Sequence, residues 1–176
     1  MPLTMPSRTA NATSAAASTP AAAPPAAEPA PPTAANWRGV RAAIDIGSNS
    51  FRLEIGQLRG GRYRRIDYLK DTVRLGAGLD EQGRLGGEAA ERGLACLRRF
   101  RERLTGIPGS QFRAVATQTL REATNRNAFL LQAAEALGHP VEVISGREEA
   151  RLIYKGVARL QPSDQPRLVI DIGGRS

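Results

Sequence analysis

The chain of 176 residues is long enough for one domain of ordinary size with an additional tail. It carries 25 basic and 17 acidic residues, and the net charge of +8 favours an anionic ligand. A single cysteine excludes an intramolecular disulfide, and a single histidine excludes a Cys/His zinc site. No run reaches the roughly 18 apolar residues that a membrane-spanning helix needs, so we expect a soluble, cytoplasmic protein with no membrane span.

The basic residues are almost all arginines, since only Lys70 and Lys155 are lysines. Such a skew reflects the base composition of a genome as much as selection for arginine chemistry. We therefore do not take the positive charge as a sign of nucleic-acid binding, and we predict no nucleic-acid partner.

Residues 1–36 differ in composition from the rest of the chain. They contain 13 alanines and 8 of the 12 prolines, and they lack Val, Ile, Phe, Tyr and Trp. Such a segment cannot bury enough apolar surface to offset the entropy that it would lose on folding. The prolines also interrupt the apolar core that a signal peptide needs. We predict a disordered tail over residues 1–36 and a folded part that starts at residue 37.

Three short strands open the folded part. Residues 41–47 are typical of a buried strand, and residues 50–57 alternate between apolar and polar side chains. Gly60 and Gly61 then predict a hairpin turn, because glycine tolerates the positive φ that such turns require. Residues 63–70 return as a third strand, so the sequence predicts an antiparallel meander.

Helices and strands alternate in the remainder of the chain, after a glycine-rich loop over residues 75–87. The predicted helices are residues 88–104, 127–137 and 147–160, and the predicted strands are residues 112–116, 141–144 and 167–172. Alternation of this kind indicates parallel strand pairs covered by helices. The predicted fold class is therefore α/β, with a mixed sheet that combines the antiparallel meander and parallel strands.

One short motif occurs twice, 126 residues apart. Residues 44–50 (IDIGSNS) and 170–176 (IDIGGRS) agree at five of seven positions, and each copy places an aspartate, Asp45 or Asp171, near the end of an apolar strand. The glycine allows a tight turn whose backbone N–H groups can approach an anion. The aspartate can hold a hydrated divalent cation. One such turn is common in ordinary hairpins, but two copies predict a clamp around a phosphate chain.

A second motif begins the predicted helix over residues 147–160. Ser145 and Glu148 have the spacing of a capping box, which gives Glu148 a local structural role. Glu149 has no such role. It is either a first-turn carboxylate that interacts favourably with the helix dipole, or a general base that activates water.

A third motif, TQTLR over residues 117–121, follows the predicted strand at 112–116. α/β folds gather ligand-binding residues at the carboxyl ends of their strands. Arg121 is therefore either a solvated loop charge or a guanidinium that binds phosphate.

These motifs together resemble a known family. Residues 42–55 (AAIDIGSNSFRLEI) and 168–174 (LVIDIGG) resemble the actin-like ATPase superfamily, whose fold is related to ribonuclease H. Residues 92–104 (RGLACLRRFRERL), 116–125 (ATQTLREATN) and 143–157 (VISGREEARLIYKGV) resemble the exopolyphosphatase and guanosine-pentaphosphate phosphohydrolase (Ppx/GppA) family within it. The resemblance extends over about residues 40–176.

The resemblance implies Mg²⁺-dependent hydrolysis of the terminal phosphate of inorganic polyphosphate, with Glu149 as the catalytic base and Asp45 and Asp171 at the metal. Hydrolysis of guanosine pentaphosphate and binding of anions without catalysis are the alternatives. The full-length family members are expected to be homodimers. The residues implied in phosphate binding are Gly47, Ser48, Asn49, Ser50, Arg121, Gly173 and Gly174.

The sequence departs from the family pattern at its C-terminal end. The family's second loop reads D-I-G-G-G-S followed by Thr and Glu, whereas Arg175 replaces the third glycine here and Ser176 is the last residue. We expect residues 37–166 to form the first actin-like lobe. Residues 167–176 are expected to form the first strand and phosphate loop of a truncated second lobe. From that interpretation we expect weak or no catalysis by this chain alone.

Overall fold

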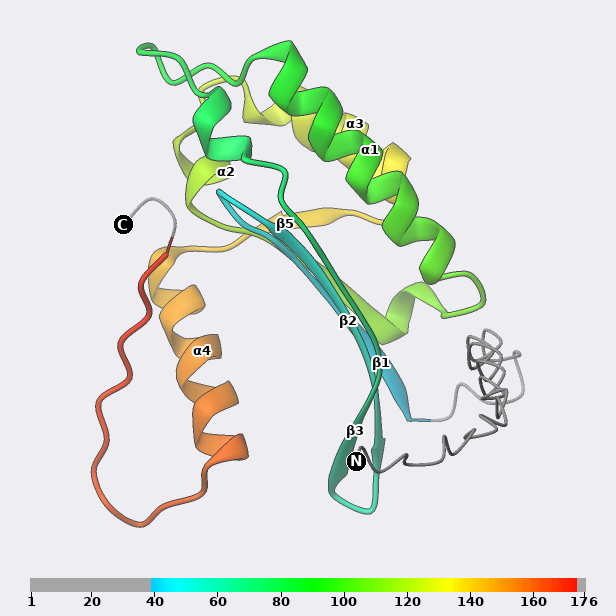
Figure 1. Cartoon of the computed structure of the whole chain (residues 1–176), viewed down its shortest axis with the longest axis vertical. Helices are drawn as coiled ribbons and strands as arrows, with labels where there is room; N and C mark the ends of the chain where they lie inside the picture. The colour runs from blue at the N-terminus through cyan, green and yellow to red at the C-terminus, as the bar shows by residue number, and fades with distance from the viewer. Residues whose placement is uncertain (1–38, 174–176) are drawn as a thin grey trace, which may run out of the picture. The chain divides into compact units, whose positions relative to one another are not determined.

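The structure is a computed structural model, and it describes residues 39–173 (Figure 1). The tail predicted for residues 1–36 lies outside the described residues, as do Gly174, Arg175 and Ser176. The proposed domain boundaries at residues 37 and 167 therefore stay predictions.

The described residues form one five-stranded mixed sheet with the strand order β3-β2-β1-β4-β5. The strands are β1 (Val40–Ile46), β2 (Phe51–Arg59), β3 (Arg62–Asp71), β4 (Phe112–Ala116) and β5 (Val141–Val143). Strands β1, β2 and β3 pair antiparallel, and β4 and β5 continue the sheet parallel to β1. The predicted α/β class and the predicted meander are confirmed. The β2–β3 turn has φ of +53° at Gly60 and +76° at Gly61, which explains the glycine pair.

The hydrophobic core lies on one face of this sheet. Side chains alternate along each strand, so that Ile44 of β1 and Leu53 of β2 are buried while their neighbours Asp45 and Arg52 lie on the opposite face. Helices α1 (Gly87–Arg103) and α3 (Arg126–Leu137) lie side by side on the apolar face (Figure 1). Both helices occur where the sequence predicts them. Three short helices were not predicted: η2 (Leu75–Gly78), η3 (Gly109–Gln111) and α2 (Gln118–Glu122).

Helix α4 (Gly146–Leu160) lies beyond the opposite, more polar face of the sheet (Figure 1). Its N-cap is Ser145, whose Oγ accepts a hydrogen bond of 3.1 Å from the Glu148 N–H, as the capping motif predicts. Its last turn reaches the β2–β3 hairpin, where Arg159 donates to the Gly61 carbonyl. None of its residues is fully buried. No helix among residues 39–173 is long and apolar enough to cross a membrane.

The strand predicted at residues 167–172 is not formed. The segment after α4 has no strand within the described residues, and Leu168, Ile170 and Ile172 are 84%, 74% and 86% exposed. A strand is defined by hydrogen bonds to a neighbour, and no strand of the described residues pairs with this segment. The segment instead runs beside the first half of α4, with which it shares the lining of a pocket.

Candidate phosphate-binding site

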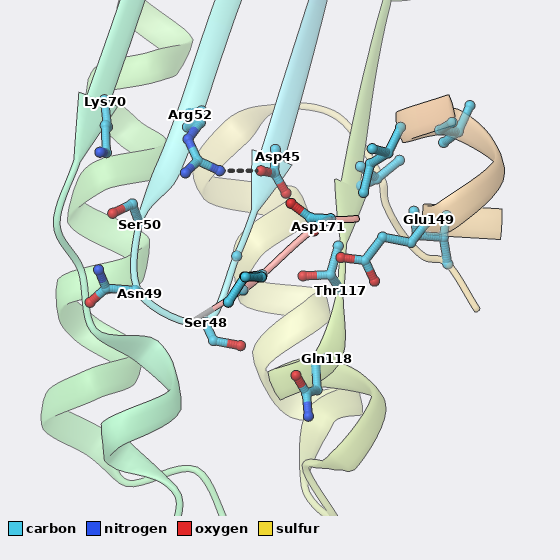
Figure 2. Close-up of a pocket in the computed structure, with 17 residues that line it drawn as sticks. Asp45, Ser48, Asn49, Ser50, Arg52, Lys70, Thr117, Gln118, Glu149 and Asp171 are labelled. Atoms are coloured by element: carbon cyan, nitrogen blue, oxygen red, sulfur yellow. Dashed lines mark hydrogen bonds and ion pairs between the residues drawn. The ribbon is translucent and has the colours of Figure 1, made fainter. Parts of the chain in front are cut away.

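The carboxyl ends of β1, β4 and β5 meet at one edge of the sheet, because the three strands are parallel. The loops that follow them begin at Gly47, Thr117 and Ile144, and each carries one of the motifs found in the sequence. A pocket of about 500 Å³ opens at this edge (Figure 2). It is lined by Asp45, Gly47, Ser48, Asn49, Ser50, Arg52, Lys70, Val115, Thr117, Gln118, Ile144, Glu149, Leu152, Ile153, Asp171, Ile172 and Gly173.

The loop after β1 is tightly folded. The Gly47 N–H donates to the Ser50 carbonyl at 3.2 Å, and a Cβ at Gly47 would lie 2.9 Å from that same oxygen. The loop therefore requires glycine for its shape. The Gly47 N–H group already has a partner inside the loop, and a contact of Gly47 with phosphate stays a prediction. The N–H groups of Ser48, Asn49 and Ser50 have no hydrogen-bond partner among residues 39–173.

Two other segments hold this loop in place. The N–H groups of Arg74 and Gly76 donate to the carbonyls of Asn49 and Ser48, each at 2.8 Å. Arg74 adopts a left-handed conformation with φ of +54° to do so. The loop carbonyls are thus turned toward the protein, and this leaves its N–H side available to an anion.

A buried hydrogen bond joins the first motif to the TQTLR motif. The Oγ1 of Thr119, which is only 1% exposed, donates to the Ser48 Oγ at 2.8 Å. The Ser48 hydroxyl accepts this bond and keeps its own hydrogen for a further acceptor. The two motifs are therefore parts of one site, although 71 residues separate them.

Three carboxylates from distant segments share the pocket. Asp45 comes from the end of β1, Asp171 from the C-terminal segment and Glu149 from the first turn of α4. Figure 2 shows Asp171 next to Asp45, with the Glu149 side chain extending toward them from α4. The two Asp-containing loops predicted to face each other thus meet at one pocket. Gly173 also lines it, whereas Gly174 lies outside the described residues.

This arrangement changes the pKa of the Asp45 carboxyl. Burial raises the pKa of the Asp45 carboxyl above its ordinary value, and the negative charges of Glu149 and Asp171 raise it further. The Arg52 guanidinium, which donates to the Asp45 Oδ2 at 2.9 Å, opposes that rise. A cation between the carboxylates would relieve their mutual repulsion.

The oxygen donors of the pocket suit Mg²⁺ in type and number. Within residues 39–173, no group of three or more His, Cys, Asp and Glu side chains is close enough to hold a metal ion. Mg²⁺, however, is usually bound by one or two carboxylates and several water molecules. Asp45 and Asp171 provide such a pair, so the predicted ligands fit the ion.

Arg121 contacts Glu149 rather than the main pocket. Its Nη1 donates to the Glu149 Oε2 at 2.8 Å and to the Ile144 carbonyl at 3.0 Å. Both side chains of the ion pair are 28% exposed. Arg121 lines an adjoining pocket, and its role as a phosphate ligand stays a prediction. The carboxylate of the neighbouring Glu148 is held by both the Nε and the Nη2 of Arg151.

Four polar residues that line the pocket were not predicted as site residues from the sequence: Arg52, Lys70, Thr117 and Gln118. Thr117 and Gln118 belong to the TQTLR motif, but the sequence argument on that motif concerned Arg121 alone. Arg52 and Lys70 come from β2 and β3. The alternation of β2 places Arg52 on the polar face of the sheet, but only the strand register shows that it lies opposite Asp45.

Comparison with known proteins identifies the family. The model of the Ppx/GppA phosphatase family matches residues 55–176. The chain belongs to this family. Among solved structures, a PPX-GPPA enzyme from Aquifex aeolicus is 32% identical, with a TM-score of 0.67 over 72% of this chain and 42% of that chain. An exopolyphosphatase from Cytophaga hutchinsonii is 30% identical, with a TM-score of 0.66 over 71% of this chain and 40% of that chain.

The comparisons also confirm the predicted α/β fold class, because this chain matches these Ppx/GppA structures with TM-scores of 0.67 and 0.66. An exopolyphosphatase-like protein is 35% identical, with a TM-score of 0.60 over 64% of this chain and 34% of that chain. This Ppx/GppA chain thus spans about two fifths or less of the length of these relatives.

Proposed function

We propose that this chain carries the phosphate-binding loop and the general base of a hydrolase that removes the terminal phosphate of inorganic polyphosphate. The observation that carries the proposal is the meeting of three carboxylates, Asp45, Glu149 and Asp171, beside the Ser48–Ser50 loop in one pocket. Family membership supports phosphatase chemistry. The positive net charge is consistent with a polyanionic substrate.

The proposed reaction is the attack of one water molecule on the terminal phosphorus. Glu149 accepts a proton from the water as the new P–O bond forms, and the phosphoanhydride P–O bond on the opposite side breaks. The products are orthophosphate and a chain shortened by one unit. The backbone N–H groups of Ser48, Asn49 and Ser50, together with the two serine hydroxyls, hold the oxygens of the transferred group, where negative charge must be stabilised.

Two further groups support this chemistry. Asp45 and Asp171 are the residues that would hold Mg²⁺, which supplies neutralisation of the charge on the phosphate oxygens. Arg121 orients the Glu149 carboxylate through the bond of 2.8 Å and ties it to the start of α4 through the Ile144 carbonyl. Glu149 is thereby presented to the pocket in one geometry.

The test compares Glu149→Gln with Glu148→Gln in the chain of 176 residues. Phosphate release from polyphosphate is measured with Mg²⁺ and with protein in excess over substrate, so that a single slow turnover is detected. Removal of a general base costs about 10²–10⁴-fold in rate. Glu148 is the matched control, because it adjoins Glu149 but pairs with Arg151 and does not line the pocket. Equal rates in the two variants would contradict the assignment of the base.

The same assay separates the alternatives. Guanosine pentaphosphate replaces polyphosphate in a parallel reaction, and faster release from the nucleotide would favour the second substrate class. Tight binding of polyphosphate with no release of phosphate by the unmodified chain, even with protein in excess, would favour an anion-binding module without catalysis.

A further inference from the structure

Helix α1 runs beside residues 71–78, the segment that holds the Ser48–Ser50 loop from behind. Three contacts join the helix to this segment: an ion pair of Arg99 with Asp71, a hydrogen bond of 3.1 Å from the Arg92 Nε to the Val73 carbonyl, and the packing of Ala89 against Gly78. A Cβ at Gly78 would overlap the Ala89 Cβ, so the helix and the segment are in close contact there. The three α1 residues are three and seven positions apart, which places them on one side of the helix. Residues 71–78 are therefore fixed along one side of α1.

The middle contact acts on a peptide group that also touches the loop. The Val73 carbonyl and the Arg74 N–H belong to one planar peptide, so the direction of one fixes the direction of the other. Arg92 donates to the oxygen of this peptide, and its N–H donates to the Asn49 carbonyl at 2.8 Å. Turning the peptide over would break both bonds and take Arg74 out of its left-handed conformation, with φ of +54°, which a residue with a Cβ adopts at a cost. The two hydrogen bonds therefore hold the peptide in an orientation that Arg74 by itself disfavours.

From this doubly held peptide we propose that Arg92 is a positioning residue for the phosphate loop. Its Nε keeps the Val73–Arg74 peptide turned so that the Asn49 carbonyl points toward the protein, and the N–H side of the loop then faces the anion. Arg92 does not line the pocket, so it acts through the peptide and not by touching phosphate. The inference rests on the proposed function, because that function assigns the Ser48–Ser50 loop to phosphate binding.

Two substitutions separate the hydrogen-bond donor of Arg92 from its positive charge. The side-chain nitrogen of glutamine follows Cδ, as the arginine Nε does, so Arg92→Gln keeps a donor at that place and loses the charge. Arg92→Met loses both the donor and the charge. Arg98→Met is the matched control, because it removes the same charge from an exposed position of the same helix, where Arg98 pairs with Glu91 of α1 itself.

Two measurements are made on chains that also carry Glu149→Gln, which prevents turnover. Amide hydrogen exchange of the Arg74 N–H is followed by NMR without ligand, and calorimetry with Mg²⁺ gives the dissociation constant for tripolyphosphate. We expect Arg92→Met to raise the exchange rate and the dissociation constant by about three- to tenfold each, as the loss of one hydrogen bond predicts. Exchange of the β1 amides should not change, Arg92→Gln should restore both values, and Arg98→Met should alter neither.

Three results would overturn the proposal. Equal weakening of binding in Arg92→Gln and Arg92→Met would assign the effect to charge and not to the donor. An unchanged dissociation constant in Arg92→Met would leave Arg92 a role in the fold alone. Faster exchange of the β1 amides to the same extent as the Arg74 N–H would mean that the whole sheet is destabilised.

Failure of this inference and failure of the proposed function give different results. Binding that does not depend on the Arg92 donor, in a chain that releases phosphate when Glu149 is intact, removes the positioning role alone. Binding that depends on that donor, in a chain that releases no phosphate at all, removes the catalytic proposal and retains the positioning role. Absence of any binding of tripolyphosphate by the unmodified chain overturns both.

Discussion

The hydrogen bond between Thr119 and Ser48 is the part of the site whose contribution can be worked out most directly. Thr119→Val keeps the branched shape of the side chain and removes its donor. The Thr119 side chain is 1% exposed, and its bond to the Ser48 Oγ is 2.8 Å long. One such buried bond contributes about 0.5–1.5 kcal/mol. We therefore expect the free energy of unfolding to fall by about 1 kcal/mol in Thr119→Val.

A double-mutant cycle with Ser48→Ala isolates this interaction. Urea unfolding followed by circular dichroism gives the free energy of unfolding for the unmodified chain, the two single variants and the double variant. The loss in the double variant should be about 1 kcal/mol smaller than the sum of the single losses, because no hydroxyl is then left without its partner. Additive losses, within about 0.3 kcal/mol, would refute the reasoning.

The same substitution should also weaken phosphate binding, although Thr119 does not line the pocket. The hydrogen bond fixes the Ser48 hydroxyl, and its loss lets that hydroxyl turn away from an anion. Thr124→Val is the matched control, since Thr124 donates to the Gly83 carbonyl on an exposed surface. Calorimetry with tripolyphosphate should show weaker binding for Thr119→Val and unchanged binding for Thr124→Val. Unchanged binding in both variants would mean that the hydrogen bond from Thr119 to Ser48 has only a structural role.

Three further predictions concern the loop, its carboxylate and the core. Gly47→Ala should weaken tripolyphosphate binding measured by calorimetry, because the new Cβ would lie 2.9 Å from the Ser50 carbonyl; Gly87→Ala, where nothing lies within 4 Å, should not. Asp45→Asn should raise the melting temperature at pH 7. The pKa of the Asp45 carboxyl is raised in the folded state, so the folded state binds the proton more tightly than the unfolded state, and the stability of the unmodified chain falls as the pH rises past the ordinary pKa. The higher melting temperature of the Asn variant should therefore vanish below about pH 4. Leu97→Ala in α1, at a fully buried position, should cost about 2–5 kcal/mol in urea unfolding.

Much of the fold could be predicted because the buried positions repeat with a regular period. In β2, Phe51, Leu53 and Ile55 are all buried, and their spacing of two residues is visible in the sequence. In α1, Leu94 and Leu97 are buried with helical spacing. Helix α2 (Gln118–Glu122) could not be predicted in this way, because five residues are too few to show a period.

The site could be predicted only as far as its motifs are local. The repeated Asp-Gly turns and the capping motif are contiguous, so the sequence alone offers Asp45, Asp171 and Glu149 as candidate site residues. The partner of Glu149 could not be predicted, because Arg121 is 28 residues away and the pairing depends on how α4 starts. Lys70 could not be predicted for a related reason, since the register of β3 against β2 is not encoded in either strand alone.

In the C-terminal segment, the prediction of secondary structure from alternation and the prediction of a residue at the pocket have different outcomes. Leu168, Ile170 and Ile172 alternate as a half-buried strand would, yet all three are exposed, because a ladder of hydrogen bonds requires a neighbour that alternation does not specify. Asp171 nevertheless lies at the pocket, next to Asp45. The position of a site residue therefore depends here on the path of the chain beside α4. Substitution of Asp171 by Asn should accordingly weaken Mg²⁺-dependent binding of tripolyphosphate, while leaving the urea unfolding of the sheet unchanged.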